Sequence, residues 1–392
     1  MKTSLLSETD FLTSIRAVAE ETAGPAADDV DRQARFPTES FDRLRANGAL
    51  SAFVPPRFGG PGVSVTGIAQ ACFELGRRCG ATGLIFAMHQ IQVITLVRHA
   101  GDATWFGDYL SRQVEQQRLI GSVTSEVGTG GDLGRSVAAA TERPDGLCSL
   151  SKQAPTVSYG RHAEDLMITA RQSAAAEPVD QVLVLASGDQ VTLDETTAWD
   201  PLGMRGTCSP GYHVEAVYHP EQTLAQPFAR IATESMVPVS HLLWSHVWLG
   251  IATDAFERTR DFVRRQARQA RGEPPPAARR LSHLMAELTL MQTLIKSALA
   301  EFVECRGDEG RQRLSTMAAV LRYNNLKTAA AEHVGRVCQE ALSVCGIMGY
   351  LNNTPFSVGR QLRDALSASV MVANERIHET NAALLLVAKD IW

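Results

Sequence analysis

The stretch from residue 122 to residue 132 reads Ser-Val-Thr-Ser-Glu-Val-Gly-Thr-Gly-Gly-Asp and has the residue types of a ligand-binding loop. Glycine lets backbone N–H groups approach a ligand closely and hydroxyl groups add short hydrogen bonds, so the stretch suits a cofactor with phosphate or heteroaromatic groups. Gly128, Gly130 and Gly134 are not spaced as in the dinucleotide-binding fingerprint, and the following residues are predicted to form a strand. Alone, such a loop is more often a plain turn, so its interpretation depends on the elements around it.

The residues before this loop show the helical spacing of apolar side chains. The helices that we predict there span residues 4–22, 38–46, 65–79 and 82–99. Thr38, directly after Pro37, is the predicted N-cap of the second helix. The fourth helix is apolar on most sides and is predicted to be buried, so that His89 within it is more simply a hydrogen-bonded core residue than a catalyst.

From Leu119 onward the apolar residues alternate with a period of two, which indicates strands. The predicted strands span residues 119–125, 136–141, 147–152, 165–171, 181–187, 190–194 and 212–219. Because no helix-length segment separates them, they favour an antiparallel β-sandwich or β-barrel over alternating strands and helices.

After Pro227 the helical spacing returns in four long amphipathic segments, at residues 239–270, 278–306, 309–346 and 359–388. Four long helices with short connections form a bundle. The predicted fold is therefore of the α+β class, with an N-terminal α-helical domain at 1–117, a central antiparallel β-domain at 118–228 and a C-terminal four-helix bundle at 229–392.

The composition is that of a soluble globular protein, with 44% hydrophobic and 21% charged residues. A net charge of −5 gives no reason to expect nucleic acid or a membrane surface as a partner. No apolar run approaches the roughly 20 residues that span a bilayer, and the N-terminus lacks the apolar core of a signal peptide. The seven cysteines are scattered without a Cys-x-x-Cys pair, which argues against a disulfide framework or a metal site and indicates a cytoplasmic protein.

The order of these three parts, together with six local matches, resembles the acyl-CoA dehydrogenase superfamily of flavoproteins. The matches lie at Phe36–Gly62, at Ser125–Asp132, which is similar to the family's flavin loop, and at Gly203–Ser209, Gly250–Phe256, Gly346–Gly349 and Arg363–Ala365. Each match is short, but six in the expected order and at the expected distances identify the chain as a member of the family.

The resemblance implies FAD between the β-domain and the bundle, with the site completed by a neighbouring subunit of a homodimer or homotetramer. The residues that would bind the flavin are Ser122, Thr124, Ser125, Gly128, Gly130, Gly131, Thr156, Ser158, Arg268, Gly346 and Gly349. The chain departs from the family pattern at two of the matched positions. Gly131 stands where the family has a serine, and Ala154 stands where it has a tryptophan that shields one face of the flavin.

The family's dehydrogenases also need a glutamate, which takes the weakly acidic α-proton of an acyl thioester and follows the Arg-Asp motif. Counted without a gap from Arg363-Asp364, the residue at that position is Val372. Glu375 is the nearest substitute if the chain carries a small insertion. Other family members place the base on the first helix of the bundle, where this chain has Ser240 and His241. The catalytic candidates are thus Glu375 and His241.

These departures leave three functions open. The first is FAD-dependent α,β-dehydrogenation of an acyl thioester carried by CoA or an acyl-carrier protein, with Glu375 as a displaced base and an electron-transferring flavoprotein as acceptor. The second is a flavin-dependent monooxygenase or dioxygenase of secondary metabolism that uses O2 on a CoA ester or small aromatic substrate and needs no glutamate. Its polar groups would come from Ser158, Tyr159, His162, His241 and His378. The third is a non-catalytic relative that keeps FAD or only the fold.

Overall fold

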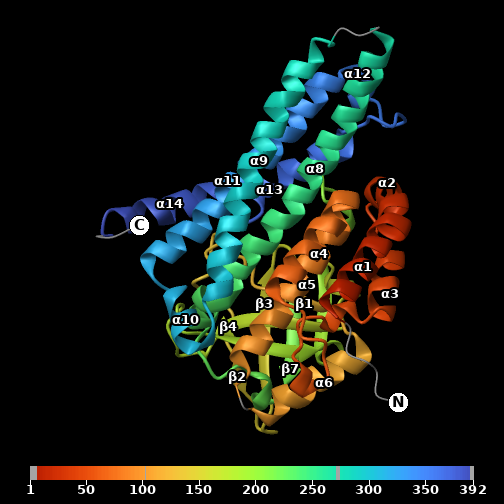
Figure 1. Cartoon of the computed structure of the whole chain (residues 1–392). Helices are drawn as coiled ribbons and strands as arrows, with labels where there is room; N and C mark the ends of the chain where they lie inside the picture. Colours follow the sequence, from red (N-terminus) through yellow and green to blue (C-terminus); the bar gives the residue numbers. More distant parts are fainter. Residues whose placement is uncertain (1–6, 102, 271–273, 389–392) are drawn as a thin grey trace.

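A computed structural model of the chain describes residues 7–101, 103–270 and 274–388 (Figure 1). A helical N-terminal part is followed by two β-sheets and a long helical C-terminal part, which confirms the predicted α+β class. The predicted start of the first helix at residue 4 lies outside the described residues. The proposed domain boundaries at 117/118 and 228/229 remain predictions.

The N-terminal helices contact the C-terminal helices chiefly through the two that span residues 65–78 and 80–99 (Figure 1). They are α1 (Glu8–Val18), α2 (Gly24–Gln33), α3 (Thr38–Ala46), α4 (Val65–Arg78), α5 (Gly80–His99) and α6 (Thr104–Gln116). A π-helical turn at Ala19–Ala23 joins α1 to α2, so the first helical segment runs beyond its predicted end near residue 22. Pro37 rather than Thr38 occupies the N-cap of α3, so the predicted Thr38 cap is wrong. The sequence prediction also lacked α6.

Helix α5 is the core helix of this part. Among the described residues, it is the one helix whose length and apolar composition would suffice to cross a membrane. The prediction that no apolar run approaches this length is therefore wrong. Most residues in the most apolar stretch of this helix are buried within the protein. It packs against α4, α8 (Val237–Gln269) and β1 (Ile120–Val123), as expected for a helix that is apolar on most sides.

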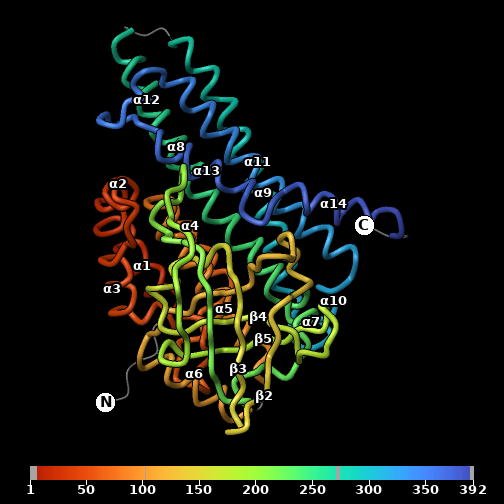
Figure 2. Tube along the Cα trace, turned by 180° about the vertical axis from the view of Figure 1, so that it is seen from behind, coloured from red at the N-terminus to blue at the C-terminus, as the bar shows by residue number. Residues whose placement is uncertain are grey.

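Two small sheets form the central part, seen from behind in Figure 2. The first has the order β1-β4-β5, with β1 (Ile120–Val123), β4 (Asp165–Arg171) and β5 (Gln181–Ser187). The second has the order β2-β3-β7-β6, with β2 (Thr141–Glu142), β3 (Cys148–Ala154), β7 (Gly211–Tyr218) and β6 (Val191–Thr197). Strand β1 pairs in parallel with β4, so the prediction of antiparallel pairing is wrong there, although the other pairs are antiparallel. Of the strand predicted at 136–141, only the last residue is in β2.

The first sheet is covered on both faces. Leu166 and Ile168 of β4 face the second sheet, in a cluster that includes Leu150 of β3 and Val214 of β7. Met167 of β4 belongs instead to the core shared with the helices. The β4 sequence is nearly continuous in apolar residues because both of its faces are buried, whereas β3 alternates between buried and exposed residues.

The C-terminal part consists of long and short helices, and the long ones extend beyond the sheets (Figure 1). They are α7 (Phe228–Ile231), α8 (Val237–Gln269), α9 (Ala277–Glu304), α10 (Gly307–Arg313), α11 (Met317–Cys345), α12 (Ile347–Tyr350), α13 (Gly359–Val370) and α14 (Asn374–Leu385). The third predicted helix is broken at residues 314–316. The fourth is broken at residues 371–373, where Val372 has a left-handed φ of 48°.

Buried hydrogen bonds fix the start of the glycine-rich stretch against the helical part. The Nδ1 atom of His89 accepts from the backbone N of Ile120 at 3.0 Å, and Nε2 donates to the carbonyl of Leu50 at 2.7 Å. Burial lowers the pKa of His89 to about 4, so the ring is neutral. The prediction of a hydrogen-bonded core histidine is confirmed, and its effect is to attach β1 to α5.

A second connection joins the sheets to the last helices, between two of the motifs that carried the family resemblance. The Oδ1 atom of Asp364 accepts from the backbone N of Met204 at 2.7 Å. The preceding Gly203 lies so close to α13 that a Cβ atom there would be 2.0 Å from the carbonyl oxygen of Arg363. Burial raises the pKa of Asp364 to about 6. The Gly203 and Arg363-Asp364 motifs therefore contact one another.

Close packing of α8 on α4 depends on glycine, and it yields a stability prediction. A Cβ atom at Gly250 would lie 2.5 Å from the backbone N of Arg77, so Gly250→Ala should destabilise the protein by about 1–3 kcal/mol through overpacking. Gly335→Ala on α11 is the control, because no atom lies within 4 Å of its Cβ position and alanine favours a helix by up to about 1 kcal/mol. Urea unfolding measures both. Equal stability of Gly250→Ala and the wild type would contradict the close packing.

Candidate functional site

The structure brings together two of the segments predicted to hold the flavin. The Oγ of Ser125, just after β1, donates to the carbonyl of Thr156, just after β3, at 2.6 Å. The backbone N of Val127 donates to the carbonyl of Gln153 at 2.9 Å. Ser122 and Thr124 are partly exposed on the β1 side of this junction, and Thr156 is exposed on the β3 side. Hydroxyl groups from both segments are thus available at one edge of the sheets.

Ser158 and Tyr159 continue the β3 side and are more enclosed. The Oγ of Ser158 accepts from the Oγ of Ser209 at 2.9 Å, and Ser209 is also in contact with the hydroxyl of Thr207. Tyr159 is fully buried in a left-handed conformation, and its hydroxyl donates to the carbonyl of Ile120 at 3.0 Å. Tyr159 therefore has a structural role at β1, while Ser158 keeps a hydroxyl near the candidate site.

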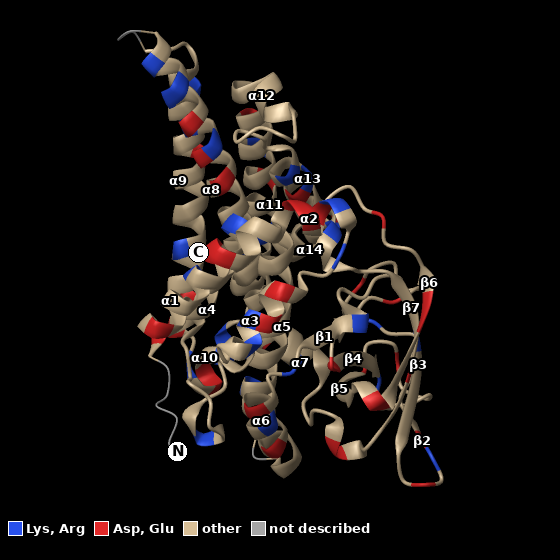
Figure 3. Ribbon diagram, turned by 90° about the vertical axis from the view of Figure 1, so that its right-hand side faces the viewer, with Lys and Arg blue, Asp and Glu red and all other residues tan. Residues whose placement is uncertain are grey.

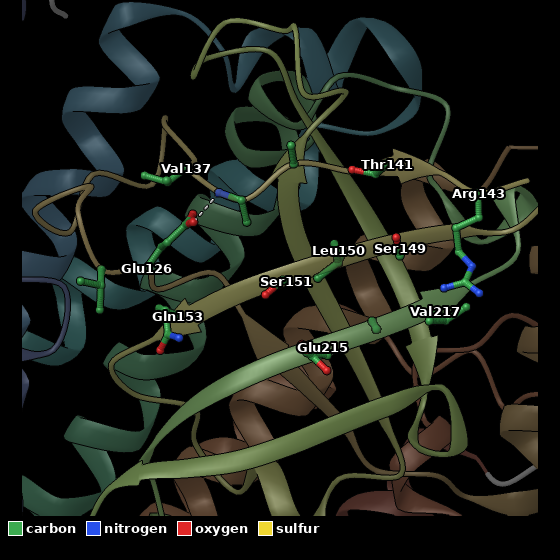
Figure 4. A pocket seen from close by; sticks show the side chains of 14 residues that line it. Glu126, Val137, Thr141, Arg143, Ser149, Leu150, Ser151, Gln153, Glu215 and Val217 are labelled. Atoms are coloured by element: carbon green, nitrogen blue, oxygen red, sulfur yellow. Dashed lines mark hydrogen bonds between the residues drawn. The ribbon is translucent and has the colours of Figure 1, made fainter.

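A buried ion pair that the sequence reasoning missed fixes the glycine-rich loop. Glu126 accepts from the Oγ of Ser136 and from the backbone N of Ala138, both at 2.6 Å, as Figure 4 shows for Ala138. Its carboxylate also lies 3.4 Å from the Nζ of Lys152 on β3. Lys152 donates to the carbonyl and the hydroxyl of Thr169 at 2.7 and 2.8 Å. An acidic residue inside a Gly-rich loop and a lysine in an alternating strand were the only signals in the sequence.

The groove in Figure 4 runs along the outer face of the second sheet and has Glu126 and Val137 at one end. It has a volume of about 620 Å³ and is lined by residues of β3 and β7 together with Glu126, Val127 and Val137. Gln153 is in its lining, whereas Ser125 and Thr156 are not. The groove is therefore adjacent to the candidate flavin site but separate from it.

The glycines of the loop have the backbone that an anion-binding concavity requires. Their φ values are 93° at Gly128, 62° at Gly130 and 85° at Gly131. Among the hydrogen bonds of the described residues, none is donated by the backbone N–H groups of residues 128–131. Successive free N–H groups in left-handed glycine conformations form a site for phosphate oxygens. The loop, with the hydroxyl groups of Ser125 and Thr156, therefore fits a flavin phosphate and ring.

The ungapped count from Arg363-Asp364 leads to Val372, which lies in a strained turn held by a buried lysine. Val372 is 50% exposed and adopts a left-handed conformation that is rare for a β-branched residue. The Nζ of Lys327 on α11 donates to the carbonyl of Val372 and to the Oδ1 of Asn374, both at 2.7 Å. Lys327 is fully buried, its Nζ lies 5.9 Å from the ring centre of Trp248, and burial lowers its pKa to about 7.

His241 lies on α8 in the same part of the bundle as Lys327. Its Nδ1 is 3.0 Å from the carbonyl of Tyr323, so this nitrogen carries the proton, and the ring packs near Trp244. Burial, together with Lys327, lowers the pKa of His241 to about 3. A neutral imidazole of such low basicity is a poor proton acceptor near pH 7. The indole Nε1 groups of Trp244 and Trp248 are buried and have no partner among the described residues.

Glu375 is exposed in the first turn of α14. No hydrogen bond or ion pair is described for its carboxylate, and the adjacent Arg376 is the residue that approaches the glycine loop. Glu375 is therefore next in sequence to a residue that contacts the loop, but its own side chain is exposed to solvent. His378 is also exposed on α14, and His162 stacks on Phe36 at a ring distance of 4.2 Å.

Three predicted flavin contacts lie at the far end of the bundle. Arg268 is predicted to reach the FAD diphosphate of a neighbouring subunit, and Gly346 and Gly349 are predicted to let the bundle approach the adenosine end of the cofactor. Arg268 is exposed near the end of α8, where Lys and Arg residues gather at the tip of the α8–α9 pair (Figure 3). Gly346 caps α11 with a φ of 56°, and Gly349 is buried in α12 close to Cys345. This end lies away from β1 in Figures 1 and 2. The structure does not bring these residues to the glycine loop of the same chain, and their roles in flavin binding remain predictions.

The described residues contain no group of three or more His, Cys, Asp or Glu side chains that could hold a metal ion. All seven cysteines are free thiols, and none forms a disulfide.

Two family profiles match the chain. Residues 7–116 match the family described as acyl-CoA dehydrogenase, N-terminal domain, and residues 232–381 match acyl-CoA dehydrogenase, C-terminal domain. One relative is the mitochondrial isovaleryl-CoA dehydrogenase of Solanum tuberosum, 24% identical over 371 residues that cover 93% of this chain and 87% of the relative. Another is the amino sugar nitrososynthase DnmZ of Streptomyces peucetius, which is 24% identical over 358 residues that cover 88% of this chain and 84% of the relative.

Among solved structures, the FMN-bound dibenzothiophene monooxygenase TdsC of Paenibacillus sp. A11-2 is similar in fold. Its TM-score is 0.82 at 20% identity, with 96% of this chain and 97% of that chain covered. At this identity the similarity shows the fold alone.

The buried ion pair below the loop yields a prediction for Glu126→Gln. The amide leaves the Lys152 ammonium without its charge partner, so the variant should lose about 2–4 kcal/mol of stability. Urea unfolding measures the loss, and Glu142→Gln on exposed β2 is the control. Adding Lys152→Met should recover part of the loss. A Glu126→Gln variant as stable as the wild type would contradict the assignment.

Lys327 should make stability depend on pH. Its pKa is about 7 in the folded protein against an ordinary value of about 10.4 when unfolded, so the unfolded chain binds more protons between these values. The contribution of Lys327 to stability should therefore rise as the pH increases from about 7 towards 10. The stability difference between the wild type and Lys327→Met, measured by urea unfolding at pH 6.5, 8 and 9, should grow. Lys296→Met, at an exposed site on α9, is the control, and a constant difference for Lys327→Met would refute the prediction.

Proposed function

Because the chain belongs to the acyl-CoA dehydrogenase family of flavoproteins, we propose that it is a flavin-dependent monooxygenase that acts on a small aromatic substrate or a CoA ester. The turn at Val372 carries this proposal, since Lys327 holds a backbone carbonyl and an amide where a dehydrogenase of the family needs a carboxylate. Removal of an α-proton from an acyl thioester requires that carboxylate, whereas oxygen transfer does not.

The flavin would be held by the hydroxyl groups of Ser125 and Thr156 and by the N–H groups of residues 128–131. When bound and reduced, it supplies two electrons, so that one atom of O2 enters the substrate and the other leaves as water. Ser158 and the loop fixed by Glu126 would orient the ring, because both are anchored by hydrogen bonds to neighbouring segments. Fixed hydrogen bonds of this kind give a defined geometry without movement during the reaction.

The bundle side of the site would bind and shield the substrate. His241 is neutral and poorly basic, so it adds no charge that would draw water into the site. The indole N–H groups of Trp244 and Trp248 have no partner within the part of the chain that the structure describes, and they could donate to a polar atom of the substrate. Excluding water also protects a reactive oxygen species from unproductive decay.

The names of two relatives support oxygen chemistry on this fold. TdsC is called a dibenzothiophene monooxygenase, and DnmZ an amino sugar nitrososynthase. We further propose FAD as the cofactor, with FMN as the alternative because FMN is bound to TdsC. The protein would act as a cytoplasmic homodimer or homotetramer in which Arg268, Gly346 and Gly349 contact the flavin of a neighbouring subunit.

The reaction with oxygen tests this function. The holoprotein is reduced without air, mixed with ¹⁸O2, and supplied with dibenzothiophene, indole or a CoA ester. We expect rapid reoxidation without an electron-transferring flavoprotein and one labelled oxygen atom in the product. A reduced protein that passes electrons to an electron-transferring flavoprotein but not to O2 would contradict the proposal.

Dehydrogenation of an acyl thioester, the first expectation from the sequence, is the second candidate. It is favoured by Glu375, which begins α14 beside the Arg376 that approaches the glycine loop. If Glu375 is the base, Glu375→Gln should lower turnover of acyl-CoA at least about 100-fold, whereas Glu379→Gln on the same helix should not. Full turnover by Glu375→Gln would remove Glu375 from that role.

A further inference from the structure

The side chain of Arg376 lies over the two glycines that close the loop. A Cβ atom at Gly130 would be 3.0 Å from Nη2 of Arg376, and one at Gly131 would be 3.4 Å from Nε. We propose that Arg376 binds a phosphoryl group seated on residues 128–131, and that Lys327 is the residue that positions it. The inference rests on the proposed function in one respect, namely which molecule carries the phosphoryl group. That molecule is either the flavin or a substrate with a phosphoryl group.

The guanidinium group of Arg376 is available for a ligand. Arg376 is exposed, and no ion pair or hydrogen bond of its side chain occurs among the described residues. Asp132, the acid that directly follows Gly131, accepts a hydrogen bond through its Oδ1 from the backbone N–H of Gly134 at 2.8 Å. The planar guanidinium presents parallel N–H donors that match two oxygens of a phosphate.

The loop supplies the backbone donors of the same site. Gly128, Gly130 and Gly131 all have positive φ values, and the N–H groups of residues 128–131 donate to no described acceptor. The Cβ distances place the guanidinium directly against Gly130 and Gly131, so a ligand does not fit between them. A phosphate would instead bind beside both groups, where it can accept from the loop N–H groups and from the guanidinium together.

The bundle determines where Arg376 is held. Lys327 fixes the carbonyl of Val372 and the side chain of Asn374, two residues before Arg376. Farther along α14, Asn381 accepts from Asn324 at 2.8 Å and donates to Asn325 at 2.9 Å. Because α11 provides all three partners, α11 sets the position of α14 and thereby the distance from Arg376 to the loop.

Binding of three flavins to the apoprotein tests the assignment, because riboflavin lacks the phosphate of FMN and the diphosphate of FAD. Affinities follow from quenching of flavin fluorescence. Arg376→Gln should weaken FMN and FAD binding about 10- to 100-fold, the range of one or two charge-assisted hydrogen bonds, and change riboflavin binding less than about threefold. Arg376→Lys should recover part of the loss, and Arg112→Gln, at an exposed arginine on α6, is the control.

The positioning role of Lys327 is tested by the ratio of FMN affinity to riboflavin affinity, taken from the same binding measurements. Lys327→Met should lower this ratio while Arg376 is present and should have no further effect in the Arg376→Gln background. A merely structural role would weaken both flavins alike and leave the ratio unchanged. Additive effects on the ratio in the double variant would overturn the positioning role even if Lys327→Met reduces stability.

Coenzyme A and dTDP binding to the holoprotein distinguishes the two sources of the phosphoryl group. If Arg376→Gln leaves the FMN-to-riboflavin ratio unchanged but weakens coenzyme A or dTDP about 10-fold or more, the phosphoryl group belongs to the substrate and the assignment stands. If neither flavin phosphates nor these probes respond, the assignment is wrong. Both readouts are independent of oxygen transfer, so failure of the proposed function would leave them intact.

Discussion

A buried ammonium group without a buried carboxylate partner has to be satisfied by neutral oxygens, and in this protein Lys327 finds them in the turn at Val372 and Asn374. The cost of burying the charge is visible in the pKa of about 7, and the left-handed Val372 adds strain of about 1–3 kcal/mol. Hydrogen bonds from the neighbouring helix α11 hold the turn in this strained conformation. It ends the long helix that the sequence predicted and starts α14 in a new direction.

A second buried lysine has a parallel role on the other side of the site. Lys152 on β3 is buried beside Glu126, and Glu126 in turn holds the backbone at Ala138. Burial lowers the pKa of Lys152 to about 8, while the carboxylate of Glu126 opposes this shift. One lysine therefore fixes the glycine-rich loop from the sheet and the other fixes the facing turn from the bundle. The site lies where these two segments meet.

Elements whose pattern reflects local burial could be predicted from the sequence. The limits of β4 and β5 agree with the prediction because apolar runs bounded by turn residues are a local signal, and His89 could be assigned to the core because its helix is apolar on most sides. Features that depend on distant contacts could not. The break at Val372 depends on Lys327, which is 45 residues away, and the parallel pairing of β1 with β4 leaves no mark in either strand. The contact of Arg376 with Gly130 could not be predicted for the same reason, because the two residues are far apart in the chain.

We propose that a lysine-held turn stands in place of the base that acyl-thioester dehydrogenation requires. The decisive experiment is to mix the flavin-loaded protein with butyryl-CoA and isovaleryl-CoA without air and to record the visible spectrum of the flavin. We expect the oxidised spectrum to persist with both thioesters, while dithionite reduces the same sample. Bleaching of the flavin by either thioester would contradict it.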